Sequence, residues 1–182
     1  MKTSARATAL GLSLLVAGVA AALPAAAQTA TEATTADTMM KVDKASFIKA
    51  VASSNEFEIA SSKLALEHAS KDDVKKFAQM MIDDHTKAGK EFAAAAGQEA
   101  PSGEAALNPK HAAMLKELSA AGMDKFDQLY IDAQTAAHME AVSLFRSYSS
   151  APDDEALGAF AKKTLPTLEM HLEHVKALAS AK

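Results

Sequence analysis

Apolar residues recur every three or four positions through four long segments of the chain, and this spacing constrains the fold more than any other feature. An α-helix places residues at such intervals on one face, so each segment predicts a helix with one buried stripe. The absence of tryptophan and the low number of tyrosines also fit packed helices better than a sheet. The pattern is clearest near the carboxyl end, where it runs through Leu157, Phe160, Leu165, Leu168, Leu172, Val175 and Leu178.

Capping residues and helix breakers give the expected limits of the first two helices. Asp43 opens the first helix, whose apolar stripe begins at Phe47. Ser70 and Asp73 resemble a capping box that separates the first helix from the second. The Gly- and Pro-rich stretch at 97–109 predicts a loop after the second helix.

The second half of the chain carries similar signals. Asn108 as N-cap and Pro109 at the first helical position predict a short third helix. Asp124 can cap a long fourth helix, and Pro152 precedes a fifth. Long helices joined by short turns favour an all-α, antiparallel four-helix bundle over residues 43–182, with the short helix in the central crossover.

The start of the chain has the three parts of a secretory signal peptide. Lys2 and Arg6 form a positively charged start, residues 10–23 form an apolar stretch, and three alanines follow at 25–27. A retained membrane helix needs about 20 strongly apolar residues. Because this stretch is shorter and interrupted by glycine, we expect cleavage near Ala27-Gln28 rather than anchoring.

Export places the mature chain in the periplasm or outside the cell, with association with the outer membrane as an alternative. Residues 1–27 are then a signal peptide, and the Thr- and Ala-rich residues 28–42 a flexible leader. The mature chain offers no second long apolar stretch, so we expect no integral membrane span after cleavage. With no cysteine, the domain is expected to be held together by helix packing alone.

Composition and motifs also limit the function. The formal net charge is −4, and removal of Lys2 and Arg6 would make the chain more acidic, which argues against nucleic acid as a partner. The chain contains no Gly-x-Ser-x-Gly elbow and no phosphate-binding glycine loop. We therefore identify no catalytic and no organic cofactor-binding residues, and expect a protein that is not an enzyme.

One group of residues predicts a metal site. His85, His138 and His171 fall on three different long helices, and Glu58 lies on the remaining one. His85 and His171 continue the apolar stripes of their helices, whereas His138 borders its stripe. All four lie near the middle of their helices, and such positions meet in one layer of an up-and-down bundle. One carboxylate and three imidazoles can bind a divalent transition metal.

The alternative is that these histidines are ordinary hydrogen-bonded core residues. If a metal binds, Asp84 and Asp132 could orient the imidazoles from behind. His68 and His111 lie at helix ends and are expected at the surface, and His174 is expected to be exposed.

Three segments resemble a known family. They are MMIDDH at 80–85, the Phe126-Asp127 to Tyr130 step followed by His138, and KTLPTLEMH at 163–171. The chain is similar over about residues 43–180 to the exported domain of unknown function 4142 family, described as a predicted outer membrane protein type. The resemblance implies a ferritin-like fold and no established activity.

The chain departs from the di-iron ferritins. Those bundles carry Glu-x-x-His on two helices, but no histidine of this chain has a glutamate three positions before it. The residues at those positions are Ala65, Ile82, Asn108, Thr135, Leu168 and His171. We therefore expect no ferroxidase centre. Two interpretations stay open: a non-catalytic envelope protein that binds a protein partner, and a transition-metal-binding protein.

Overall fold

The computed structural model describes residues 42–181, and all of their regular structure is helical. The predicted signal peptide at 1–27 and nearly all of the predicted leader at 28–42 lie outside the described residues. Two short 3-10 turns, Gly97–Glu99 and Gly103–Ala106, interrupt the long connection between the second and third helices. The α-helices are α1 (Lys44–His68), α2 (Asp72–Ala96), α3 (Pro109–Ala120), α4 (Met123–Ser150) and α5 (Glu155–Ser180).

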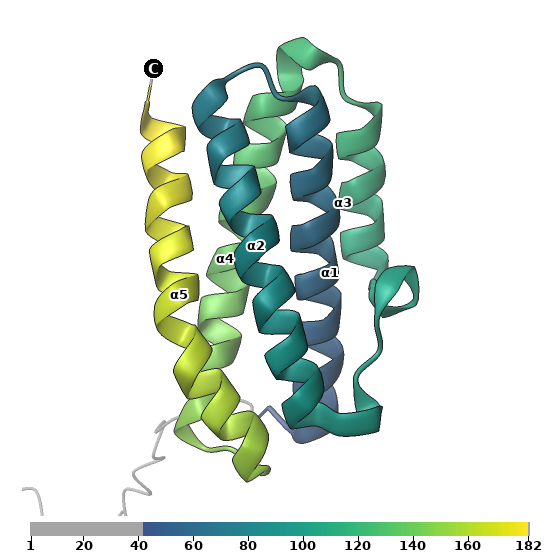
Figure 1. Ribbon diagram of the computed structural model, residues 1–182, viewed down its shortest axis with the longest axis vertical. Coiled ribbons are helices and arrows are strands. Elements are labelled where there is room, and N and C mark those ends of the chain that lie inside the picture. Colours follow the sequence, from purple (N-terminus) through teal and green to yellow (C-terminus); the bar gives the residue numbers. More distant parts are fainter. Residues whose placement is uncertain (1–41, 182) are drawn as a thin grey trace, which may run out of the picture. The chain divides into compact units, whose positions relative to one another are not determined.

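The helices pack side by side, and successive helices run in opposite directions (Figure 1). α1 contacts α2 and α4, and α5 contacts the same two helices. α3 packs mainly against α1. The prediction of an all-helical fold is therefore confirmed, and the contacts are compatible with a four-helix bundle. Among the described residues, no helix is long and apolar enough to cross a membrane.

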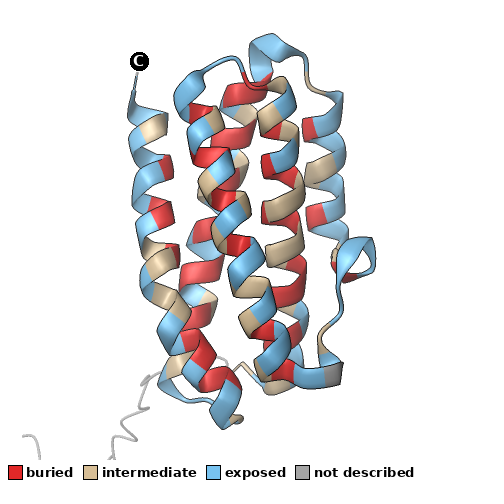
Figure 2. Cartoon of the chain, viewed as in Figure 1, coloured by how far each residue is buried: buried red, intermediate tan, exposed pale blue. Residues whose placement is uncertain are grey.

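The buried residues line the facing sides of the helices (Figure 2). Phe47 of α1 stacks on Tyr148 of α4, with ring centroids 3.9 Å apart, and meets Phe145 edge-on at 5.3 Å. Phe160 of α5 joins Phe145 to Phe92 of α2, with a centroid distance of 5.7 Å on each side. Complete burial of such a side chain contributes about 1.5–3 kcal/mol, so this aromatic layer ties all four long helices together.

Two of the predicted helix caps are present. The Asp43 carboxylate accepts a hydrogen bond from Ser46 N at 2.7 Å, and the Asn108 side chain accepts one from His111 N at 2.8 Å. Such caps satisfy backbone N–H groups that have no partner within the helix. α5 begins later than Pro152, because Asp154 caps it through Leu157 N.

The predicted capping box at Ser70 is wrong. α2 begins at Asp72, and its N-cap residue, Lys71, makes no side-chain capping bond. The Asp127 carboxylate of α4 instead accepts hydrogen bonds from Ser70 N, Ser70 Oγ and Lys71 N, at 2.9, 2.6 and 3.0 Å. Ser70 thus ties the turn between α1 and α2 to α4 through its hydrogen bonds to Asp127. A buried carboxylate with three donors is well satisfied.

We expect Asp127→Asn to lower the free energy of unfolding by about 1 to 2 kcal/mol. The NH₂ group of asparagine cannot accept a hydrogen bond, so at least one donor that binds Asp127 loses its partner. Urea denaturation measures this change. Asp124→Asn is the matched control, since Asp124 also lies in the first turns of α4 but is exposed. Equal destabilisation by the two variants would show that lost charge near the helix start, rather than the buried hydrogen bonds, causes the effect.

Candidate metal centre

Three histidines from three helices meet in the interior. His85 of α2, His138 of α4 and His171 of α5 are all buried, with exposed fractions of 6%, 0% and 1%. Their ring centroids lie 5.5 to 5.8 Å apart in each pair. The predicted inward positions of His85 and His171 are confirmed, and His138 is buried as well.

One nitrogen of each ring is hydrogen-bonded to an oxygen atom outside the group of three histidines. His85 Nδ1 lies 3.2 Å from Asn55 Oδ1, His138 Nδ1 lies 2.9 Å from the Gln134 carbonyl oxygen, and His171 Nε2 lies 2.9 Å from Asp84 Oδ2. A carbonyl or carboxylate oxygen can only accept, so the ring nitrogen must carry the hydrogen. Each of these contacts therefore fixes the tautomer of a neutral imidazole.

The second nitrogen of each ring remains available as a ligand. His85 Nε2, His138 Nε2 and His171 Nδ1 are buried without a hydrogen-bond partner among the described residues. The three histidines each offer a ligand atom within 4.8 Å of the others. A tetrahedral ion at about 2.1 Å holds its ligand nitrogens about 3.4 Å apart. Small ring rotations would therefore bring the three lone pairs onto one ion.

The surroundings keep the imidazoles neutral. Burial lowers the pKa of His85 well below 6.5 and that of His138 to about 4. Burial also lowers the pKa of His171, although the Asp84 carboxylate opposes this shift. Neutral imidazole is the form that binds a metal. At neutral pH the group consists of three uncharged donors.

Glu58 lies beside the group rather than within it. Its carboxyl group is 1% exposed, and its Oε1 is 3.5 Å from His138 Nδ1, the nitrogen on the outer side of that ring. Burial raises the pKa of Glu58 to about 8, and the Gln134 side chain opposes this shift. A carboxyl group behind a ligand histidine can orient the ring and increase its basicity. The structure thus brings the three histidines together and places Glu58 behind one of them.

Of the two aspartates predicted to orient the rings, one contacts a histidine. Asp84 binds His171, as described above. Asp132 is exposed and accepts a hydrogen bond from Gln128 Nε2 at 2.8 Å. The partners that sequence analysis missed are Asn55 and the backbone carbonyl of Gln134. Asn55 lies three residues before Glu58 on the same helix, a spacing that could have indicated it.

His111 is not a surface residue as predicted. It is 5% exposed, its ring stacks on Phe57 with centroids 5.0 Å apart, and its Nδ1 lies 2.7 Å from Ser53 Oγ. The cause is α3, which packs against α1 and covers this histidine. His174 is exposed, as predicted, and His68 is half-buried.

His111 should make the protein less stable in acid. Burial, together with Lys110, lowers its pKa from 6.5. As the pH falls through about 6.5, the unfolded chain takes up a proton that the folded chain resists, so stability is lost. Between pH 7.5 and pH 5, denaturation should show a larger loss of unfolding free energy for the wild type than for His111→Asn, which keeps an acceptor for Ser53. A pH dependence unchanged by His111→Asn would contradict this account.

Fold and site together define an all-helical protein with a buried group of three neutral histidines. The chain belongs to the family described as Domain of unknown function (DUF4142), whose model matches residues 28–178. The resemblance noted in the sequence to this family is thereby confirmed. No curated protein and no solved structure matches the chain.

Proposed function

We propose that this protein binds one divalent transition-metal ion through His85 Nε2, His138 Nε2 and His171 Nδ1. The observation that carries the proposal is how the two nitrogens of each ring are hydrogen-bonded. One nitrogen of every ring is hydrogen-bonded to an oxygen, the other has no partner among the described residues, and the three rings offer ligand atoms within 4.8 Å of one another. Metal-binding histidines show this arrangement, with the second nitrogen donating to a carbonyl or carboxylate oxygen.

The alternative of an ordinary polar core explains the group less well. A buried polar atom without a partner costs about 1–3 kcal/mol, and here three such atoms lie on neighbouring rings from three helices. With the tautomers fixed from outside, each ring leaves one lone pair unused. A cation bound by the three nitrogens satisfies all three atoms at once.

The three imidazole nitrogens also restrict which metal ion can bind. Imidazole suits zinc, copper, iron and nickel, and three protein ligands leave a fourth position open. The nearest acidic side chains, Glu58 and Asp84, both lie on the outer side of a histidine ring. The proposed centre is therefore mononuclear, because among the described residues no carboxylate belongs to the group of three histidines, whereas a di-iron bundle uses several glutamates.

We also propose that the protein acts after export. The support is the signal-like segment at 1–27 and a family match that begins at residue 28, next to the predicted cleavage position. The interpretation as a partner-binding envelope protein has no comparable cluster behind it. The metal site is the function that the geometry favours.

Titration of the metal-free protein with Co²⁺ tests the proposal. We expect visible absorption bands typical of tetrahedral or five-coordinate cobalt, which stop growing at one equivalent. Competition with Zn²⁺ should then remove the bands. A protein that produces no such bands and binds neither ion would overturn the proposed function.

Gly89 gives a prediction with two opposite effects. A Cβ atom at this position would lie 2.8 Å from Asn55 Nδ2 and push away the side chain that holds His85. We expect Gly89→Ala to weaken metal binding by about tenfold. The metal-free protein should gain up to about 1 kcal/mol, because alanine favours a helix interior over glycine.

Metal competition assays and denaturation of the metal-free protein measure the two effects separately. Asn55→Ala is the companion variant, since it removes the same hydrogen bond without adding an atom at residue 89. The two variants should lose similar metal affinity. Unchanged affinity in both would show that Asn55 does not orient His85.

A further inference from the structure

The two sides of the histidine layer are packed differently. On the side toward the α1–α2 turn, one helical turn away, the neighbours are Met81, Gln134 and Val175, all with an exposed fraction of 0%. On the other side, the corresponding positions are Ala88 on α2, Ala141 on α4 and Leu168 on α5. Two of these three are alanines, and α1 adds Ser54. The second layer is therefore short of side-chain volume.

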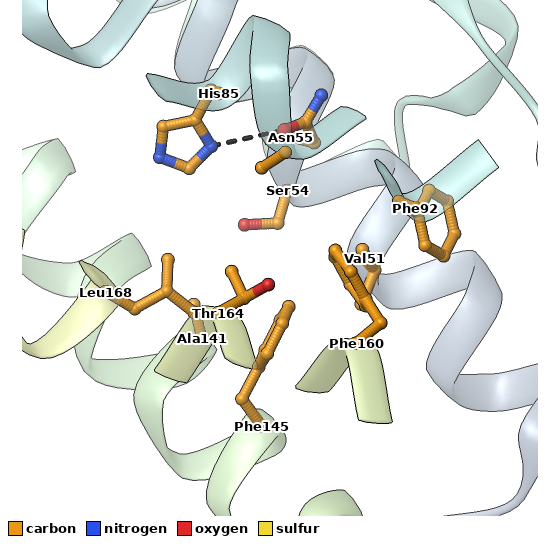
Figure 3. Close-up of a pocket in the computed structure, with 11 residues that line it drawn as sticks. Val51, Ser54, Asn55, His85, Phe92, Ala141, Phe145, Phe160, Thr164 and Leu168 are labelled. Atoms are coloured by element: carbon orange, nitrogen blue, oxygen red, sulfur yellow. Dashed lines mark hydrogen bonds between the residues drawn. The ribbon is translucent and has the colours of Figure 1, made fainter. Parts of the chain in front are cut away.

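A cavity occupies this second layer and reaches His85 (Figure 3). It leaves about 20 Å³ for the centre of a water-sized molecule, and about 10 to 15 Å³ is enough for one water. Phe92, Phe145 and Phe160 of the aromatic layer line the cavity on the side away from His85 (Figure 3). Its lining combines His85 and Asn55 with Val51, Ser54, Ala88, Phe92, Ala141, Phe145, Phe160, Thr164 and Leu168.

The lining selects the kind of molecule that fits. Most of the lining side chains are apolar, and no lysine, arginine or carboxylate is among the described residues that form it. No side chain of the lining would therefore offset the charge of an anion, whereas a neutral molecule needs no counter-charge. Ser54 and Thr164 add two hydroxyl groups at the edge of the cavity, which can donate to one polar atom (Figure 3). The size admits a molecule of one or two heavy atoms.

A surface groove borders the cavity. It lies between α2 and α5, has a volume of about 100 Å³, and shares Ala88 and Thr164 with the cavity. Both shared residues are half-buried. A small neutral molecule could enter between them without unfolding either helix.

We infer that the cavity beside His85 binds a neutral diatomic molecule of the dioxygen and nitric oxide class, which coordinates the open position of an Fe²⁺ ion held by the three histidines. This inference rests on the proposed metal site. Because buried side chains fill the other side of the histidine layer, a ligand reaches the ion from the cavity. Binding forms one bond between the iron and the molecule and breaks none, and the Fe²⁺ ion supplies the electron density that the molecule accepts.

Nitric oxide is the probe. Purified protein is loaded with Fe²⁺ without oxygen, its iron content is measured, and nitric oxide is added. We expect about one iron–nitrosyl complex per iron by electron paramagnetic resonance. In Ala141→Leu, which fills the cavity, nitric oxide affinity should fall by about tenfold or more, equivalent to about 1.4 kcal/mol. The iron content should be unchanged.

Ala136→Leu is the matched control, because Ala136 lies on the same helix but is exposed, and it should behave as the wild type. Ala88→Leu, at the half-buried rim, replaces Ala141→Leu if that variant does not fold. This inference would be overturned if the iron-loaded wild type formed no nitrosyl complex, or if the cavity-filling variants formed it as readily as the wild type. It would also be overturned if the protein bound Co²⁺ but no Fe²⁺. A protein that binds none of these metals would instead overturn the proposed function.

Discussion

The His138→Ala protein is expected to contain no bound transition metal under conditions in which the wild type holds one ion. His138 supplies one of three nitrogen ligands, and two imidazoles do not complete a site of the kind that zinc and its neighbours prefer. Metal content after dialysis should fall from one ion per chain to background. Metal at 100 times its dissociation constant stabilises a protein by about 2.7 kcal/mol, and this increment should vanish from thermal denaturation.

His174→Ala is the matched control for this variant. His174 is exposed and lies one helical turn from His171, outside the group of three. It should keep both the metal and the thermal increment. Retention of one metal ion by His138→Ala, with a normal helical circular dichroism spectrum, would contradict the assignment of this residue as a ligand.

Asp84→Ala is expected to weaken metal binding by about 10- to 100-fold. The Asp84 carboxylate holds His171 Nε2 at 2.9 Å and so directs Nδ1 toward the centre of the group. Without it, the ring loses both its orientation and its fixed tautomer. Asp84→Asn keeps an oxygen acceptor and should lose less affinity than Asp84→Ala. Competition with a chromophoric chelator measures all of these constants.

Asp83→Ala controls for the loss of one negative charge next to the site. Asp83 is exposed, and it accepts a hydrogen bond from Gln79 rather than from a histidine. Its metal affinity should stay close to that of the wild type. Equal losses in Asp83→Ala and Asp84→Ala would mean that general electrostatic attraction, and not orientation of His171, explains the effect.

The sequence was sufficient to predict the helices and the meeting of the three histidines. Periodicity placed His85 and His171 on buried faces, because each continues an apolar stripe with steps of three and four. The antiparallel order then brought mid-helix positions to one height. Both inferences depend only on helical geometry and on short connections, which a single sequence displays.

The details around the histidines could not be predicted in the same way. His171 and Asp84 are 87 residues apart in the chain, and Ser70 and Asp127 are 57 apart. Which side chains meet across two helices depends on the rotation of each helix and on side-chain rotamers, and periodicity fixes neither closely. For the same reason, Glu58 was predicted as a fourth ligand in the histidine layer, whereas its carboxylate lies nearest the outer nitrogen of His138.

His111 shows a second limit. Its helix is short and its apolar stripe is weak, so sequence analysis did not indicate a buried face. The structure places α3 against α1, where Phe57 and Ser53 receive the ring. α1 consequently buries residues on more than the one face that its apolar stripe predicts.

A crystal structure of the metal-loaded protein, with diffraction data collected on both sides of the metal absorption edge, tests the central claim most directly. We predict one anomalous difference peak per chain, at about 2.1 Å from His85 Nε2, His138 Nε2 and His171 Nδ1. The outer nitrogens should keep their bonds to Asn55, Gln134 and Asp84. A peak at any other place, or a fully loaded crystal with no peak among these three nitrogens, would contradict the account.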